Sequence, residues 1–179
     1  MAVGTVAISR TPVATGNRKT YTLSYWLKRG DLTNIQQIWN CYDSSSDYMY
    51  MRFTAANELY LESKTGGAAN IGFTTNRLFQ DPGAWYHIVL AVDTAQSVST
   101  NRWKVYINGV DEADTGGYSA SDYSSQDVLT PANTDTFALY IGADHNTAQG
   151  FNGEMSHVQM VDGLALAPTE FGEFDSTSG

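Results

Sequence analysis

The stretch from Trp85 to Gly109, WYHIVLAVDTAQSVSTNRWKVYING, decides the fold. Residues 85–92 are apolar on both alternating sides, which is typical of a strand in the middle of a sheet that is covered on both faces. Residues 102–107 instead alternate apolar with polar, and Asn108-Gly109 after them supplies the positive φ angles that a type I′ turn requires. We therefore predict two neighbouring strands, 85–92 and 102–107, and a third strand that begins at Val110.

The rest of the chain repeats this pattern of short strands separated by turn residues. Tyr48–Phe53, for example, alternates Met49, Met51 and Phe53 with more polar neighbours. Such spacing is typical of a sandwich or jelly roll, and we predict an all-β, two-sheet antiparallel jelly-roll sandwich. The other predicted strands are 5–8, 21–28, 35–40, 58–62, 71–74, 137–142 and 155–161, and one helical turn is predicted at 167–171.

Length and charge limit the classes of protein. The 179 residues fit a single domain, which we place at 1–175 with 176–179 as a tail or linker. The net charge of −9 argues against a nucleic-acid partner, because affinity for phosphates depends on Lys and Arg. No apolar run approaches the length of a membrane span, so no membrane partner is expected. The single cysteine, Cys41, cannot form an internal disulfide.

The segment from Asp111 to Asp135 interrupts the rhythm of strands. It is polar and shows no strand pattern, and long loops inside compact domains are often functional. We predict that it is dispensable for folding and binds a ligand. Its tyrosines offer rigid contact area and its polar side chains offer hydrogen bonds. The predicted ligand-binding residues are Tyr118, Asp122, Tyr123 and Gln126.

Candidate metal ligands follow two of the predicted strands. Asp93, Asp144 and Asn146 offer the hard oxygen atoms that Ca²⁺ prefers. The same side chains are also typical of polar loop tips that hold no metal, and no dense EF-hand-like loop is present. The three histidines are too widely spaced to indicate a zinc site, and no organic cofactor is expected.

Four segments together resemble the laminin-G-like or concanavalin-A-like sandwich family. The resemblance covers about half of the chain and concerns the fold more than the ligand. The segments are WYHIV at 85–89, VYING at 105–109, LYIG at 139–142 and FNGEMSHV at 151–158.

A narrower resemblance is to the version of this module in structural proteins of tailed bacteriophages. It implies a non-enzymatic virion component, such as a fibre, decoration or appendage protein, which is assembled in the host cytoplasm. Its expected partners are other virion proteins, further copies of the same chain and, as a second class, host surface glycans. The segments are RTP at 10–12, GNRKTYTLSYWLKR at 16–29, FQDPGAWYH at 79–87 and VDG at 161–163, with Leu166, Pro168 and Phe171-Gly172.

The alternative is a carbohydrate-active enzyme or a free lectin of the same fold. Glucanases of this family carry Glu-x-Asp-x-Glu on one strand. In this chain Glu58 and Glu62 have that spacing, but Tyr60 replaces the central aspartate. We therefore interpret the two residues as solvated glutamates that flank a tyrosine, and we expect the protein not to be an enzyme.

Overall fold

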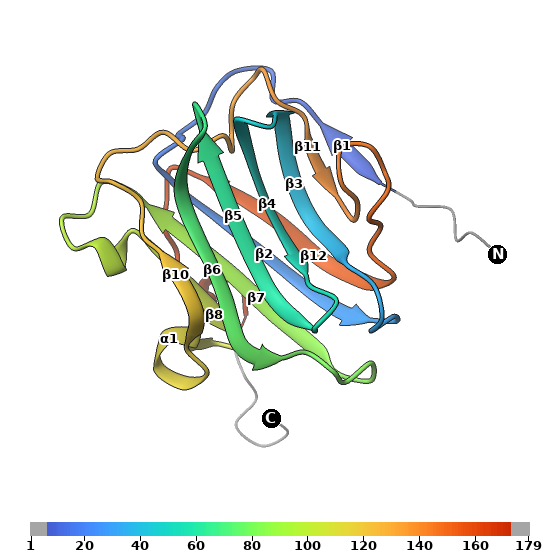
Figure 1. The fold of residues 1–179 in the computed structure, drawn as a ribbon. Coiled ribbons are helices and arrows are strands. Elements are labelled where there is room, and N and C mark those ends of the chain that lie inside the picture. Colours follow the sequence, from blue (N-terminus) through green and yellow to red (C-terminus); the bar gives the residue numbers. More distant parts are fainter. Residues whose placement is uncertain (1–6, 173–179) are drawn as a thin grey trace.

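The computed structural model describes residues 7–172, which form two antiparallel β-sheets packed face to face (Figure 1). The helical elements are α1 (Glu112–Thr115) and two 3₁₀ turns, η1 (Ser99–Asn101) and η2 (Pro168–Glu170). The strands are β1 (Ile8–Arg10), β2 (Thr20–Arg29), β3 (Gln36–Ser44), β4 (Asp47–Phe53), β5 (Glu58–Thr65), β6 (Ala68–Leu78), β7 (Trp85–Asp93), β8 (Trp103–Ile107), β9 (Val110–Asp111), β10 (Tyr118–Asp122), β11 (Leu139–Ile141) and β12 (Gly153–Asp162).

The sheet order confirms the predicted fold class. The seven-stranded sheet has the order β1-β11-β3-β4-β5-β6-β10, and the five-stranded sheet has the order β12-β2-β7-β8-β9. Every strand pair is antiparallel. In the described part of the chain, no helix is long and apolar enough to cross a bilayer.

Strand β7 is central, as its two apolar faces predict. It lies between β2 and β8, and Ile88 and Leu90 on its inner face are completely buried. Val89 on its outer face is also completely buried. The chain after β12 returns to this outer face, where the Thr22 hydroxyl donates to Leu164 O at 2.7 Å and accepts from Leu166 N at 2.8 Å. The predicted helical turn near the C-terminus is confirmed as η2.

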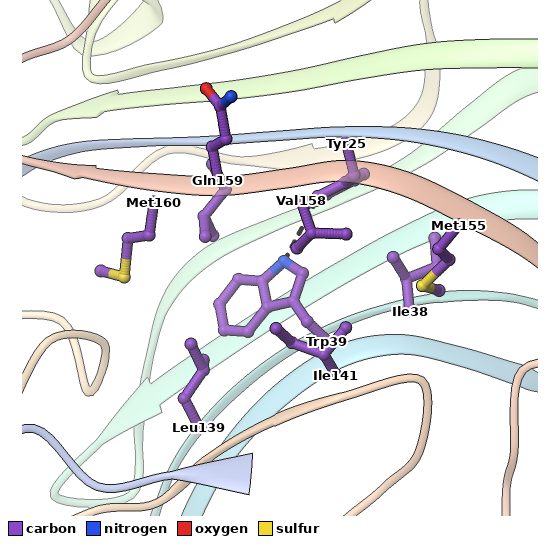
Figure 2. A pocket seen from close by; sticks show the side chains of 10 residues that line it. Tyr25, Ile38, Trp39, Leu139, Ile141, Met155, Val158, Gln159 and Met160 are labelled. Carbon is purple, nitrogen blue, oxygen red and sulfur yellow. Dashed lines mark hydrogen bonds between the residues drawn. The ribbon is translucent and has the colours of Figure 1, made fainter. Parts of the chain in front are cut away.

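The core between the sheets combines apolar side chains with two tyrosines whose hydroxyls have partners. Tyr25 donates to the sulfur of Met51 at 3.0 Å, and the Trp39 indole N–H donates to the Tyr25 hydroxyl at 3.1 Å. Beside this pair lies an apolar cavity of about 70 Å³ (Figure 2). Its wall includes Val158 and Met160 of β12. The cavity is of the size left by imperfect packing, and its lining is too apolar to hold water well.

A buried arginine connects the strand ends on one side of the sandwich. Arg29, at the end of β2, is 1% exposed and has no carboxylate within ion-pair distance among residues 7–172. Its guanidinium donates to Phe79 O at 2.6 Å and to Asn57 Oδ1 at 2.8 Å, and it lies 4.3 Å from the centre of the Phe53 ring. Carbonyl groups and an aromatic face therefore replace the water that this charge would otherwise require.

The prediction that residues 111–135 contain no strand is wrong, and the contacts of this segment argue against its being unneeded for folding. The segment contains α1 and β10, and β10 pairs with β6 at the edge of the larger sheet. Glu112 is completely buried and accepts hydrogen bonds from Arg77 Nε at 3.2 and 3.0 Å. Thr130, also completely buried, lies 3.0 Å from the Tyr21 hydroxyl. The polar composition conceals these contacts because most of them are to residues distant in the sequence.

One predicted boundary, that of the first strand, differs in the structure, and another, that of the domain, is not tested by it. The predicted strand 5–8 shares only Ile8 with the observed strand β1, which continues to Arg10 and pairs with β11. Residues 5 and 6 lie outside the described residues. The predicted tail at 176–179 also lies outside them, so the domain boundary at residue 175 stays a prediction.

Candidate functional site

The outward face of β3, β4 and β5 carries a cluster of aromatic and charged side chains. Met49, Met51 and Phe53 of β4 are completely buried between the sheets, so the residues that alternate with them point away from the core. Figure 1 shows β3, β4 and β5 side by side. We call the cluster the tyrosine platform; it comprises Tyr42, Tyr48, Tyr50, Arg52, Tyr60, Glu62, Lys64 and His145.

The rings of the platform form a continuous row. His145, from the loop after β11, lies flat on Tyr42 with 3.7 Å between ring centres and an interplanar angle of 3°. Tyr42 and Tyr48 stack at 6.3 Å, and Tyr48 and Tyr50 stack at 5.3 Å. Tyr50 and Tyr60 are tilted at 44° with their centres 5.9 Å apart. The row therefore crosses three strands and continues onto one loop.

Glu62 lies at the centre of the hydrogen bonds that hold this row. Its Oε2 accepts from the Tyr50 hydroxyl at 2.6 Å and from the Tyr60 hydroxyl at 3.1 Å, and Lys64 Nζ lies 3.5 Å from its Oε1. Partial burial alone would raise the pKa of Glu62, but hydrogen bonds from the tyrosines and the charge of Lys64 lower it overall. The carboxylate is therefore ionised at neutral pH and orients two tyrosine rings.

The interpretation of Glu62 as a solvated glutamate is therefore wrong. Its side chain is only 23% exposed and it has two hydroxyl donors. Glu58 is half-buried and accepts a hydrogen bond from the Thr54 hydroxyl at 3.0 Å. The two glutamates share a face of β5, as their spacing predicts.

Two cations lie against the tyrosine rings. The Arg52 guanidinium carbon is 4.8 Å from the centre of the Tyr50 ring and 5.1 Å from that of Tyr60. Lys64 Nζ is 5.5 Å from the centre of the Tyr48 ring. These contacts are in the range of cation–π interactions and restrict the orientation of each ring. The platform is therefore ordered by its own charged residues.

One of the predicted ligand-binding residues lies on the same face. In the register of the sheet, Tyr50 is opposite Glu62, Glu62 is opposite Gly72, and Gly72 is opposite Asp122. Asp122 Oδ2 lies 3.9 Å from the position that a Cβ on Gly72 would occupy. Because Gly72 has no side chain, the surface is lower there, and carboxylates stand on both sides of it. Asp122 therefore belongs to an extension of the tyrosine platform.

The other predicted ligand-binding residues lie at the end of the sandwich. Tyr118 and Tyr123 both contact the ring of Trp103, with centres 5.4 and 4.8 Å away. They line one wall of a cavity of about 240 Å³ that also includes Lys104 and Asp111. Gln126 donates to Ala95 O at 2.9 Å, and it is not among the residues that line this cavity. The structure thus brings Tyr118 and Tyr123 together but separates them from Asp122 on the platform.

The candidate calcium ligands do not converge. Asp93 ends β7, opposite Thr20 at the start of β2. Asp144 belongs to the loop after β11, and Asn152 O of that loop accepts from Gly30 N, just beyond the other end of β2. Asp144 is 8% exposed and accepts from Ala148 N at 2.6 Å. Asn146 accepts from Ala148 N at 3.1 Å, so both side chains of this loop hold its own backbone. Within residues 7–172, no group of three or more His, Cys, Asp or Glu residues is arranged to hold a metal ion.

Sequence reasoning placed Tyr60 and Glu62 near each other on one strand but missed the platform that they belong to. The alternation of β4 places Tyr48 and Tyr50 on one face. The pairing of Tyr50 with Glu62, and of Tyr42 with His145, depends on strand register and on the path of a loop. The one available signal for the first pairing is the turn at Ala55-Ala56-Asn57, which fixes the β4–β5 hairpin.

The chain belongs to the concanavalin A-like lectin/glucanases superfamily, whose family model matches residues 4–170. This membership confirms the family-level resemblance in the sequence. A search of curated protein sequences finds no match to this chain.

Three solved structures of low sequence identity share the fold. The CBM40 domain of the Ruminococcus gnavus IT-sialidase has a TM-score of 0.59 at 14% identity, covering 91% of this chain and 95% of that one. Domain 4 of the arabinanase AbnA from Geobacillus stearothermophilus has a TM-score of 0.56 at 19% identity, covering 88% of this chain and 66% of that one. Tailspike protein 2 of bacteriophage CBA120 has a TM-score of 0.54 at 14% identity, covering 86% of this chain but 23% of that one.

Proposed function

We propose that this protein is a non-catalytic carbohydrate-binding module whose ligand lies on the tyrosine platform. The observation that carries the proposal is the row of rings from His145 through Tyr42, Tyr48 and Tyr50 to Tyr60. A sugar ring has an apolar face of C–H groups edged by hydroxyls. Flat aromatic side chains bordered by charged groups match both parts of such a ligand.

The platform is suited to binding because it is ordered before a ligand arrives. Glu62 fixes two of the tyrosines by hydrogen bonds, and Arg52 lies over the same two rings. Side chains that are already held in place lose little conformational entropy when a ligand binds. Glu62, Arg52 and Lys64 also supply hydrogen-bonding groups of both signs for hydroxyls at the ring edge.

The arrangement of carboxylates argues against glycoside hydrolysis. Glu58 and Glu62 are four residues apart on β5, so their Cα atoms are separated by about 13 Å at ~3.3 Å per residue. A retaining glycosidase requires carboxyl groups about 5–5.5 Å apart and an inverting one about 6.5–9.5 Å, so the two side chains would have to lean toward each other over residue 60. Tyr60 stands between them and donates to Glu62, and each glutamate is engaged by a different hydroxyl.

Two proteins of the same fold support a carbohydrate ligand. The arabinanase domain has been solved in complex with arabinotriose, and the sialidase module has been solved bound to α2,3-sialyllactose. The sequence identity to this chain is 19% for the arabinanase domain and 15% for the ligand-bound structure of the sialidase module. Identities this low indicate a shared fold but do not assign binding residues.

We extend the proposal to a place in a bacteriophage particle, where the module would bind host surface glycans and contact other virion proteins. The support is the resemblance of residues 16–29 and 79–87 to phage structural proteins, together with a tailspike of the same fold. Mass spectrometry of purified particles tests this part. Detection of the chain at stoichiometric amounts would support it, and its absence from intact particles would contradict it.

A glycan array tests the binding function itself. We expect the parent to bind a defined set of glycans, and we expect Tyr42→Ala and Tyr48→Ala to reduce binding about 5- to 30-fold by removing ring contacts worth roughly 1–2 kcal/mol. Tyr106→Ala is the matched control, because this half-buried tyrosine lies on the outward face of the other sheet. Equal array profiles for the parent and both platform variants would overturn the proposal.

A further inference from the structure

We propose that the opposite sheet carries a second saccharide-binding site, in a groove of about 380 Å³ lined by Trp26, Trp85, Ser156, His157 and Phe171. The groove lies on the outward face of β2, β7 and β12, so the core of the sandwich separates it from the tyrosine platform. We call it the tryptophan groove. The groove is shallow and largely open to solvent, and four of its five lining residues carry aromatic rings.

The floor of the groove contains an indole that is held rigidly. Trp26 stacks on His87 with 4.7 Å between ring centres and an interplanar angle of 6°. His87 is 2% exposed, and its Nε2 lies 2.9 Å from the Ser24 hydroxyl. One face of the Trp26 ring is thus covered by the imidazole of His87, which lies opposite Trp26 on the neighbouring strand. Trp85, which also lines the groove, is 39% exposed. A large aromatic residue this exposed at a concave site is typical of ligand contact.

The backbone at His157 provides an independent indication of a binding site. His157 has a φ of 49°, in the left-handed region that residues other than glycine seldom adopt. It lies in a β-bulge of β12, between the register positions of Ser156 and Gln159. The Ser156 hydroxyl lies 2.7 Å from His157 Nδ1, which orients the imidazole at the edge of the groove. Bulges and left-handed residues are enriched where a side chain is directed toward a ligand.

The lining indicates a neutral ligand with an apolar face. The five lining residues include no Asp, Glu, Lys or Arg. On the same face Lys28 lies opposite Trp85 in the strand register, and Glu154 compensates its charge at 3.5 Å. A groove that offers two indole rings, one benzene ring and two small polar groups suits a neutral sugar ring. A charged sugar would find no ionic partner among the five lining residues.

Tryptophan fluorescence isolates this site from the platform. Of the four tryptophans, Trp39 and Trp103 are 2% and 1% exposed, whereas Trp26 and Trp85 line the groove. The tyrosine platform contains no tryptophan. A ligand in the groove therefore changes the emission spectrum, and a ligand on the platform leaves it unchanged. The full chain is titrated with cellotetraose, xylotetraose, chitotetraose and arabinotriose as neutral probes, and with 3′-sialyllactose as a charged one.

We expect at least one neutral probe to shift the emission saturably. We expect Trp85→Ala and His157→Gly to weaken that response at least tenfold; glycine accommodates the φ of residue 157, so the second variant removes only the side chain. Leu78→Ala is the control, because Leu78 is also exposed and apolar but lies on the other sheet. An emission shift that survives Trp85→Ala would overturn the proposal. The proposal would also be overturned if no neutral probe changed the emission, or if a Trp- or Pro-rich peptide bound to the groove more tightly than every sugar.

The experiments distinguish a failure of the platform proposal from a failure of the groove proposal. If the platform proposal is wrong but the groove proposal is right, array binding persists in the Tyr42 and Tyr48 variants and is lost in Trp85→Ala. If the groove proposal alone is wrong, array binding depends on the tyrosines and the emission spectrum never changes.

Discussion

Tyr50 and Glu62 face each other directly across β4 and β5, and the tyrosine hydroxyl donates to the carboxylate at 2.6 Å. Most exposed sheet faces carry side chains that move independently of one another. In this protein one carboxylate restrains Tyr50, Tyr60 and Lys64 together. This contact turns a set of neighbouring tyrosines into a surface of fixed shape, which lowers the entropic cost of binding a ligand there.

Removing the Tyr50 hydroxyl tests whether the contact orders the platform. Tyr50→Phe keeps the ring but deletes the donor, and we expect a loss of about 1 kcal/mol in the free energy of unfolding, because the bond is charge-assisted but partly exposed. Glycan affinity should fall several-fold because the ring is no longer fixed. Chemical denaturation and a binding titration measure the two effects. The control is Tyr106→Phe, and a Tyr50 variant indistinguishable from it would contradict the assigned role.

The ionisation of Glu62 predicts a dependence of stability on pH. Its folded-state pKa is lowered from the ordinary value of 4.5, so its charge stabilises the folded state at pH values above the unfolded pKa. That contribution disappears as the pH falls through the folded-state pKa. We therefore expect the difference in unfolding free energy between the parent and Glu62→Gln to be constant at neutral pH and to shrink below about pH 4. Denaturation curves at a series of pH values measure it, and a difference that grows on acidification would be inconsistent with an ionised, hydrogen-bonded carboxylate.

The fold follows from sequence where apolar residues recur with the period of a strand. Residues 85–92 are apolar on both faces and become the central strand β7, and Asn108-Gly109 becomes the predicted turn, with φ angles of 50° and 82°. Strand β10 was missed because most of its residues are exposed and it is recognisable only from its pairing with β6. Its polar side chains are typical of a loop until the partner strand is known.

The candidate site was only partly predictable for the same reason. Alternation places Tyr48 and Tyr50 on one face, which needs only local sequence. Glu62 lies beside these tyrosines because of the strand register, and His145 because of the path of its loop. Neither the register nor the loop path can be recognised from the local sequence. The buried cation Arg29 was equally hidden, since its partners Asn57 and Phe79 are 28 and 50 residues away in the chain.

Arg29 should be among the most sensitive positions for stability. Replacing it with alanine removes the hydrogen bonds that four acceptors receive from the guanidinium, and it removes the contact with the Phe53 ring. The four acceptors are Asp31 O, Gln36 Oε1, Asn57 Oδ1 and Phe79 O. We expect a loss of at least about 3 kcal/mol in the free energy of unfolding, since buried acceptors cost roughly 1–3 kcal/mol each when unsatisfied. Arg10→Ala, at an exposed position of β1, should change stability by less than about 0.5 kcal/mol. Urea denaturation provides the comparison, and equal effects at both positions would show that Arg29 is not a structural cation.

The segment from 111 to 135 should behave as part of the fold. Tyr123 stacks on Trp103 at 4.8 Å and an angle of 18°, so Tyr123→Ala should cost about 1–3 kcal/mol of stability through lost packing. Tyr123→Phe retains the ring and should be close to the parent. Thermal unfolding of the two variants measures the difference. A Tyr123→Ala protein as stable as the parent would restore the view of this segment as a dispensable loop.

The position of the ligand is the central claim, and backbone amide chemical shifts measured during a glycan titration test it most directly. A glycan selected by the array is added to the ¹⁵N-labelled full chain. We predict that the largest shifts fall on amides of β3, β4 and β5 near Tyr42, Tyr48, Tyr50 and Glu62, with His145 in the adjoining loop, and that they shrink in Tyr48→Ala. A ligand that binds with its largest shifts away from these strands, and unchanged affinity in Tyr48→Ala, would contradict the assignment of the tyrosine platform as the binding face.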